Sequence, residues 1–119
     1  MLLVNFSNHP SRYWDNKQRE ASRDYGELVD MPFPKIAPNA TNEELQKLTY
    51  LYVQRITSLG SPKEINVHIM GEMTFTYMIV TKLKELGIRC VASTTERKTS
   101  YSEDGTKLSE FSFVRFREY

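Results

Sequence analysis

Three short segments of the chain carry side chains of the types that bind or transform small anionic molecules. They are Ser7-Asn8-His9, Gly71-Glu72-Met73-Thr74 and Thr94-Thr95-Glu96-Arg97-Lys98. They supply hydroxyl and amide donors, two cations, and in His9 a side chain that can move a proton near neutral pH. These residue types favour a small, nucleotide-like anion as the ligand.

The segment that begins at Gly71 has two interpretations. Glycine lets the backbone approach a ligand closely, and the amides at a helix start, with the Thr74 hydroxyl, can bind phosphate. Alternatively, Gly71 makes a tight turn and Thr74 caps the helix. Glu72 would repel a phosphate if it pointed inward, whereas otherwise it favours the helix dipole or acts as an acid or base. The segment has neither the glycine spacing of a dinucleotide fingerprint nor the Lys-Ser/Thr pair of a P-loop.

The cations Arg97 and Lys98 follow a predicted strand, where they can pair with phosphates. The alternative is a solvated run of charges on a hairpin. The last residues, Arg115–Tyr119, alternate aromatic and charged side chains, so Phe116 or Tyr119 could stack on an adenine. A plain edge strand explains this alternation equally well.

The remaining reactive residue types favour structural roles. His68 alternates with apolar neighbours inside a predicted strand and is interpreted as a satisfied core residue, and Cys90 as a small buried hydrophobe. The two histidines and the single cysteine have no metal-ligand spacing, so the sequence predicts no metal and no other cofactor. No motif for a serine, cysteine or lysine nucleophile is recognisable.

The elements that position these segments follow from hydrophobic patterning. Apolar runs predict strands at 1–6, 27–31, 64–70 and 88–94. Capping boxes at Asp15/Gln18 and Thr41/Glu44 open helices that continue to Tyr25 and Leu59, and a third helix spans 72–86. An Asp-Gly turn joins the fourth strand, which continues to Tyr101, to a last strand at 108–117.

This order predicts one domain over residues 1–119, an α/β fold of the Rossmann-like three-layer α/β/α kind. Its sheet is mainly parallel and ends in a C-terminal β-hairpin. In open α/β sheets, ligands bind outside the carboxyl ends of the strands. The three polar segments all follow predicted strands, so we expect them at one edge of the sheet.

Bulk composition excludes several functions. The 16 lysines and arginines against 15 aspartates and glutamates give a net charge of +1, which argues against binding long nucleic acid. No apolar run reaches membrane-spanning length, no signal peptide is visible, and one cysteine fits a reducing compartment, so we expect a cytoplasmic protein with no membrane partner. A chain this short commonly completes a pocket by forming a two-fold dimer.

Several of these features together resemble a known family. They are the strand that runs into Gly71–Tyr77, the Ala92–Lys98 segment, the Asp-Gly hairpin, and the terminal Val114–Tyr119, with Asn5–His9 after the first strand. The chain resembles the small stand-alone CRISPR-associated proteins of the CARF (CRISPR-associated Rossmann fold) type, most closely the ring-nuclease group. The resemblance covers most of the chain and is strongest from Val67 onward.

The resemblance implies a role in antiviral defence. The implied ligand is a cyclic oligoadenylate second messenger, with cyclic tetra-adenylate as the expected ring, bound across the axis of a homodimer. The implied reaction is metal-independent cleavage, in which a ribose 2′-hydroxyl attacks the adjacent phosphate and leaves a 2′,3′-cyclic phosphate, switching off type III CRISPR signalling. Larger CARF proteins commonly have a lysine where this chain has Glu72-Met73, and they carry an effector domain.

Carried over by position, Ser7, Asn8 and His9 contact the ring, and Gly71 and Thr74 bind phosphate. Thr95, Arg97 and Lys98 hold the scissile phosphate, and His9 or Glu96 assists proton transfer. The expected catalytic residues are therefore His9, Glu96 and Arg97, and the expected ligand-binding residues are Ser7, Asn8, Gly71, Glu72, Thr74, Thr94, Thr95 and Lys98.

Three other functions stay open from the sequence. One is a sensor or sponge that binds the ring without cutting it, and another is a different nucleotide- or nucleoside-processing enzyme on a similar fold. The third is an interaction protein that uses Tyr13, Trp14 and the 32–38 loop as its contact surface, although these residues fit a core or dimer interface better.

Overall fold

The computed structural model describes residues 1–119 as a mixed α/β fold built on one five-stranded sheet. The strands are β1 (Leu2–Ser7), β2 (Glu27–Pro32), β3 (Ile65–Met70), β4 (Arg89–Tyr101) and β5 (Lys107–Glu118). Their order across the sheet is β2-β1-β3-β4-β5. The first four strands run parallel and β5 pairs antiparallel with β4, which confirms the mainly parallel sheet with a C-terminal hairpin.

Three α-helices connect the parallel strands: α1 (Asn16–Ser22), α2 (Asn42–Thr57) and α3 (Met73–Glu85). Two capping residues act as predicted, because Asp15 accepts the Gln18 amide at 2.8 Å and Thr41 accepts the Glu44 amide at 3.1 Å. Helix α1 ends before the predicted Tyr25, because the next amides bond three residues back and the chain then turns at Gly26, whose φ is +128°. None of the helices is long and apolar enough to cross a membrane.

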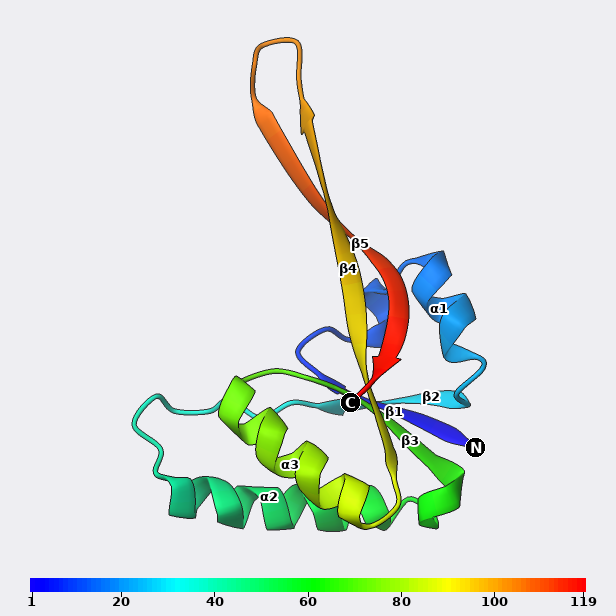
Figure 1. The fold of residues 1–119 in the computed structure, drawn as a ribbon, viewed down its shortest axis with the longest axis vertical. Helices are drawn as coiled ribbons and strands as arrows, with labels where there is room; N and C mark the ends of the chain where they lie inside the picture. Colours follow the sequence, from blue (N-terminus) through cyan, green and yellow to red (C-terminus); the bar gives the residue numbers. More distant parts are fainter.

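The two faces of the sheet differ in chemistry. One face is apolar, and its β1 and β3 side chains, such as Phe6 and Val67, form a core of 14 buried residues with α2 and α3. The other face holds a smaller cluster that includes Trp14 and Phe116, beside buried polar side chains. Helix α1 lies on this second face, on the opposite side of the sheet from α2 and α3 (Figure 1). The buried polar side chains that β1 and β3 contribute, such as Asn5 and His68, therefore share the α1 face with this smaller cluster.

Cys90 belongs to the apolar core and is 1% exposed. Burial raises the pKa of its thiol to about 12, so the thiol is protonated and unreactive at neutral pH. This confirms Cys90 as a buried hydrophobe.

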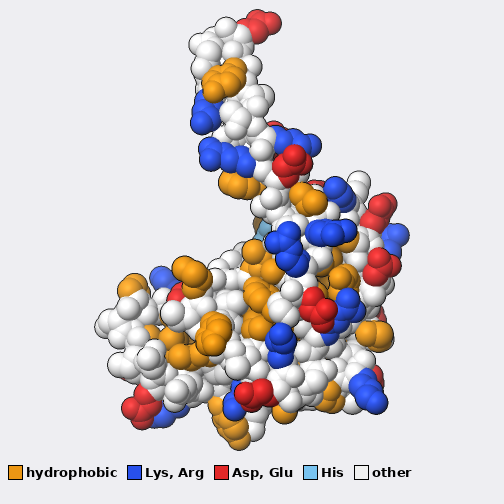
Figure 2. All heavy atoms as spheres, viewed as in Figure 1, with side chains coloured by type: hydrophobic (Ala, Val, Ile, Leu, Met, Phe, Trp, Pro, Cys, Tyr) orange, Lys and Arg blue, Asp and Glu red, His pale blue; other side chains and the backbone are white.

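The β4-β5 hairpin extends well beyond the parallel sheet. Strand β3 pairs with β4 only as far as Val91, whereas β4 and β5 stay paired out to Tyr101 and Lys107. Residues 95–113, which we name the arm, project from the body in Figures 1 and 2. A bulge lies at its base between Thr94 and Thr95, where the Thr94 hydroxyl bonds both the amide and the carbonyl of Arg115. Thr94, expected in ligand binding, thus serves the backbone of the bulge.

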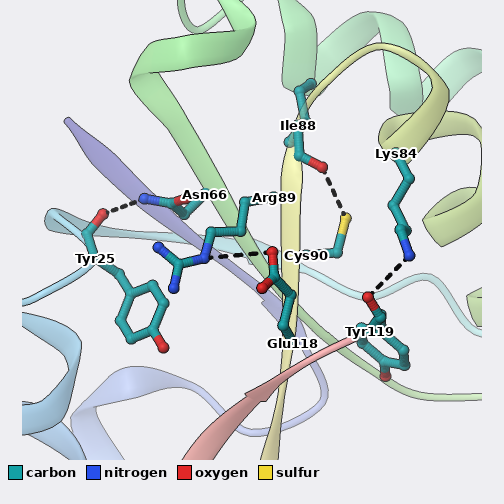
Figure 3. Close-up of polar contacts among 8 residues, drawn as sticks. All are labelled: Tyr25, Asn66, Lys84, Ile88, Arg89, Cys90, Glu118 and Tyr119. Carbon is teal, nitrogen blue, oxygen red and sulfur yellow. Dashed lines mark hydrogen bonds and ion pairs between the residues drawn. The ribbon is translucent and has the colours of Figure 1, made fainter.

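The returning strand is anchored where it reaches the body (Figure 3). Lys84 donates to the Tyr119 carbonyl at 2.9 Å, and Arg89 lies 3.6 Å from Glu118 and covers the Tyr25 ring. The Tyr119 hydroxyl donates to the backbone of β3 at 2.7 Å. Phe116 is 8% exposed and packs against the neighbouring rings, so the prediction that it stacks on an adenine is wrong.

Gly71 is required by packing. A Cβ atom built there would lie 2.4 Å from the Phe33 ring, closer than any real contact. Phe33 is buried against Phe6 and Phe75 in the apolar core, so moving its ring would disturb that packing. The backbone at Gly71 does not have a positive φ. The absence of a side chain at Gly71 is therefore explained by the ring of Phe33.

We expect Gly71→Ala to lower the free energy of unfolding by about 1–3 kcal/mol, because the added methyl overpacks against Phe33. Urea denaturation measures this loss. Gly60→Ala is the control, since its Cβ would meet only ordinary contacts at 3.6 Å or more. If the cost of Gly71→Ala were the same in a Phe33→Leu background, the steric explanation would be rejected.

Candidate functional site

The strand order places a crevice between β1 and β3. The chain passes from β1 to β2 on one side of it and then crosses to β3 on the other side. The order in which strands are added to the sheet therefore reverses between β1 and β3. Ligands in open α/β sheets bind outside the carboxyl ends of the strands at such a switch point. A cavity of about 480 Å³ lies at this place. Its lining residues are Ser7, Asn8, His9, Tyr13, Trp14, Asp15, Gln18, His68, Met70, Gly71, Ser93, Thr95, Phe111 and Phe113.

The largest hollow of the surface lies elsewhere. It measures about 650 Å³ and runs between α2 and α3, where Figure 2 shows hydrophobic side chains gathered. Its polar side chains form no buried network. We assign the site to the smaller cavity because hydrogen-bonded polar groups from four strands and α1 converge beside it, as they do in ligand sites.

A row of polar side chains crosses the sheet beneath the cavity. Asn5 is the register partner of Asp30 in β2 and of His68 in β3. The Asn5 amide nitrogen donates to Asp30 at 2.8 Å, and its oxygen lies 2.9 Å from His68 Nδ1. His68 Nε2 in turn lies 2.6 Å from the Ser93 hydroxyl in β4. One chain of hydrogen bonds therefore links four strands.

The direction of each bond in this chain follows from Asp30. Burial alone raises the pKa of Asp30, but hydrogen bonds from Asn5 and Ser11 outweigh it and hold the pKa below its usual value. The ionised carboxylate only accepts, so the amide nitrogen of Asn5 faces it and the amide oxygen faces His68. His68 must then donate from Nδ1, which leaves the lone pair on Nε2 to accept the Ser93 proton.

His68 is neutral in this environment. It is 2% exposed and its ring lies edge-on to Trp14 and Phe116. Burial, followed by the charge of His9, lowers the pKa of His68 to about 4. The interpretation as a satisfied core residue is confirmed, since both nitrogens have partners. The structure adds that this histidine also lines the cavity.

The loop after β1 is held by its own hydrogen bonds. Ser7 donates to the Asn5 oxygen at 2.7 Å and accepts the His9 amide at 3.2 Å. The His9 carbonyl accepts from Trp14 Nε1 at 3.1 Å and from Asn5 at 2.9 Å. Ser7 is buried, whereas the side chains of Asn8 and His9 are exposed. Within this predicted segment, Asn8 and His9 are thus the residues available to a ligand.

The N-terminus of α3 is occupied by the protein itself. The Glu72 carboxylate accepts the amides of Thr74 and Phe75, both at 2.9 Å, and also the Thr74 hydroxyl. These bonds lower the pKa of Glu72, so it is ionised at neutral pH. The donors expected to bind phosphate are therefore already used. Of the predicted segment, Gly71 lines the cavity and Glu72 is the helix cap.

The alternation of β4 separates the charged residues at the base of the arm. Thr95 lines the cavity, as do Phe111 and Phe113 of β5. Arg97 pairs with Phe111 and shares its face, and its guanidinium donates to Ser109 at 3.1 Å. Glu96 and Lys98, at alternate positions, lie on the opposite face of the arm. The structure thus brings Thr95 and Arg97 to the cavity side and turns Glu96 and Lys98 away.

The most connected residues of the site, Asn5, Asp30, Gln18 and Ser93, are not among the site residues predicted from the sequence. One signal was present: Asp30, Asn5 and His68 each lie two residues before the last residue of their strand. Parallel strands whose carboxyl ends align place such residues in a row. Because Asn5 and His68 stand among apolar neighbours, hydrophobic patterning alone hides the row.

The cavity suits a planar, polar ligand. Aromatic side chains of Tyr13, Trp14, Phe111 and Phe113 form its walls, and hydroxyl, amide and imidazole groups lie among them. Asp15 is the lining residue with a formal charge, and its carboxylate caps α1. The structure holds no group of three or more His, Cys, Asp or Glu placed to bind a metal ion.

Comparison with known proteins yields one family. The model of the family described as "Uncharacterized protein MJ1673 family" matches residues 1–117, nearly the whole chain. No curated protein matches the chain.

The burial of neutral His68 makes the fold sensitive to acid. Its folded pKa of about 4 lies below its ordinary value of 6.5, so the unfolded chain binds the proton more tightly. At about 1.4 kcal/mol per pKa unit, this shift corresponds to a loss of roughly 3 kcal/mol as the pH falls from 6.5 to 4. Urea denaturation across this range measures the loss. In His68→Gln, which gains no proton there, this pH dependence should disappear, and its persistence would assign the effect to other groups.

Proposed function

The chain belongs to the MJ1673 family, and we propose that it binds a cyclic oligoadenylate in the cavity at the carboxyl ends of β1 and β3 and cleaves it. The observation that carries this proposal is the lining of that cavity, in which aromatic walls surround neutral hydrogen-bonding groups at the switch point of the sheet. The identity of the ligand rests on the resemblance to ring nucleases.

The aromatic walls favour a nucleobase. Unstacked bases bind proteins by stacking on aromatic rings and by hydrogen bonds to their edges. Tyr13 and Phe111 are 64% and 70% exposed, so their rings can accept a base without unfolding the core. Asn8 and His9 lie beside them with exposed polar groups suited to a base edge.

The size of the cavity supports a dimer. A cavity of about 480 Å³ falls within the usual range for one small ligand, whereas a ring of four nucleotides is larger. Two copies related by a two-fold axis would present two such cavities to one ring. Helices on both faces of a sheet with this strand order support the Rossmann-like three-layer arrangement as part of the same proposal.

The proposed reaction needs positioning and proton transfer. A ribose 2′-hydroxyl attacks the adjacent phosphorus in line, the bond from phosphorus to the 5′ oxygen breaks, and a 2′,3′-cyclic phosphate remains. The substrate supplies the nucleophile, so the protein has to bend the ring into alignment and stabilise charge on the phosphate. Arg97, on the cavity side of the arm, is the proposed source of that charge stabilisation. In a cell, the result would be the end of a type III CRISPR signal.

Incubation with cyclic tetra-adenylate and cyclic hexa-adenylate in EDTA, with products read by mass spectrometry, tests the activity. We expect linear fragments that end in 2′,3′-cyclic phosphate. Rings that bind but stay intact would indicate a sensor or sponge, and rings that neither bind nor react would reject the proposal.

Arg97 and Lys98 form a matched pair for the phosphate assignment. We expect Arg97→Ala to weaken ring binding by about tenfold or more, since it removes a charged hydrogen-bond donor from the cavity side. Lys98→Ala removes an equal charge from the opposite face and should change the dissociation constant less than twofold. Calorimetric titration measures both, and equal effects would show that only net charge matters.

A further inference from the structure

A serine on the wall of the cavity has the hydrogen-bond partners of an activated nucleophile or base. Ser93 lines the cavity, and its hydroxyl lies 2.6 Å from His68 Nε2. His68 Nδ1 lies 2.9 Å from the Asn5 oxygen, and Asn5 is held in turn by Asp30. A hydroxyl, an imidazole and an orienting group in this order define the logic of catalytic triads on many folds.

Hydrogen bonds on the Nδ1 side of the His68 imidazole fix its orientation. The Asp30 carboxylate sets the orientation of the Asn5 amide, and the amide oxygen requires Nδ1 of His68 to donate. Ser7 also donates to that oxygen, at 2.7 Å, which confirms its role as an acceptor. The Nε2 lone pair of His68 therefore points at Ser93.

The Ser93 oxygen also has a hydrogen-bond donor that would stabilise negative charge on it. The side-chain amide of Gln18, which lies in α1, donates to the Ser93 oxygen at 3.0 Å. The hydroxyl thus has a base for its proton and a separate donor for its oxygen.

We propose that Ser93 takes the proton from the attacking ribose hydroxyl while passing its own proton to His68, a role that rests on the function proposed above. Ser93 is then the catalytic residue, and His68, Asn5 and Asp30 are positioning residues. The bond from the 2′ oxygen to phosphorus forms and the bond to the 5′ oxygen breaks. The 5′ oxygen takes a proton from water, and His68 passes its proton back through the Ser93 hydroxyl to the hydroxide so formed, so the protein is unchanged after each turnover.

The first test needs no nucleotide. Diisopropyl fluorophosphate reacts with serines that have a base at hydrogen-bond distance, so we expect its adduct on the peptide that contains Ser93, read by mass spectrometry. Ser100, on the opposite face of the arm, is the internal control and should stay unmodified. In His68→Asn, labelling should slow at least tenfold while circular dichroism reports an intact fold. If that variant does not fold, labelling of the wild type still decides the point.

The second test separates binding from chemistry. We expect Ser93→Ala to lower kcat for ring cleavage by about 100-fold or more while the dissociation constant stays within twofold. Ser100→Ala should cleave like the wild type. An unlabelled Ser93, or wild-type kcat in Ser93→Ala, would overturn this role. A labelled Ser93 in a protein that leaves rings intact would instead reject cyclic oligoadenylate as substrate and support the activated serine.

Discussion

The site depends on the burial of one amide, that of Asn5, in the middle of a strand. A buried amide is costly unless every donor and acceptor has a partner, and here Asp30, His9, Ser7 and His68 supply them. The Asn5 amide nitrogen donates to the His9 carbonyl and so fixes the loop after β1. The Asn5 amide oxygen accepts from His68 Nδ1 and so fixes the tautomer of His68. The geometry of the loop and the direction of the proton chain therefore follow from the same requirement. Such networks are rigid when complete, which is the property a site needs in order to hold a ligand in one orientation.

The asymmetry between the two faces of the sheet explains why the network can exist. Helices α2 and α3 and the Phe33 ring bury the apolar face, which provides most of the hydrophobic core. The α1 face is covered only by a helix of seven residues, the Trp14 segment and the curled end of β5. This face buries fewer apolar side chains, so it can accommodate Asn5, His68 and Gln18 as buried polar residues. The cavity opens on this face for the same reason.

The arm extends the site beyond the sheet. Because β3 stops pairing with β4 at Val91, the hairpin is free to continue, and its bulge at Thr94 allows both Phe113 and Phe116 to face the body three residues apart. Phe116 then closes the small core, while Phe113 and Phe111 continue the wall of the cavity outward. Phe116 is thus structural, Phe113 belongs to both the small core and the cavity wall, and Phe111, further out, is left exposed beside Arg97. The anchoring of Tyr119 to β3 and α3 holds the returning strand in this register.

The sequence by itself determined the elements, because helix caps, turn glycines and apolar runs act over a few residues. The strands, the three helices and the Asp-Gly hairpin follow from it, as does the position of Ser7–His9, Gly71 and Thr95 near one edge of the sheet. Tertiary structure decided which of those residues face the cavity. The Glu72 carboxylate caps its own helix, and the Thr94 hydroxyl bonds the backbone at a bulge. Strand alternation places Arg97 on the opposite face of the arm from Glu96 and Lys98. Tertiary structure also decided that Asn5, His68 and Ser93, up to 88 positions apart in the chain, share one chain of hydrogen bonds. Such a network depends on strand order and register, and these are set by long-range packing that no local pattern in the sequence records.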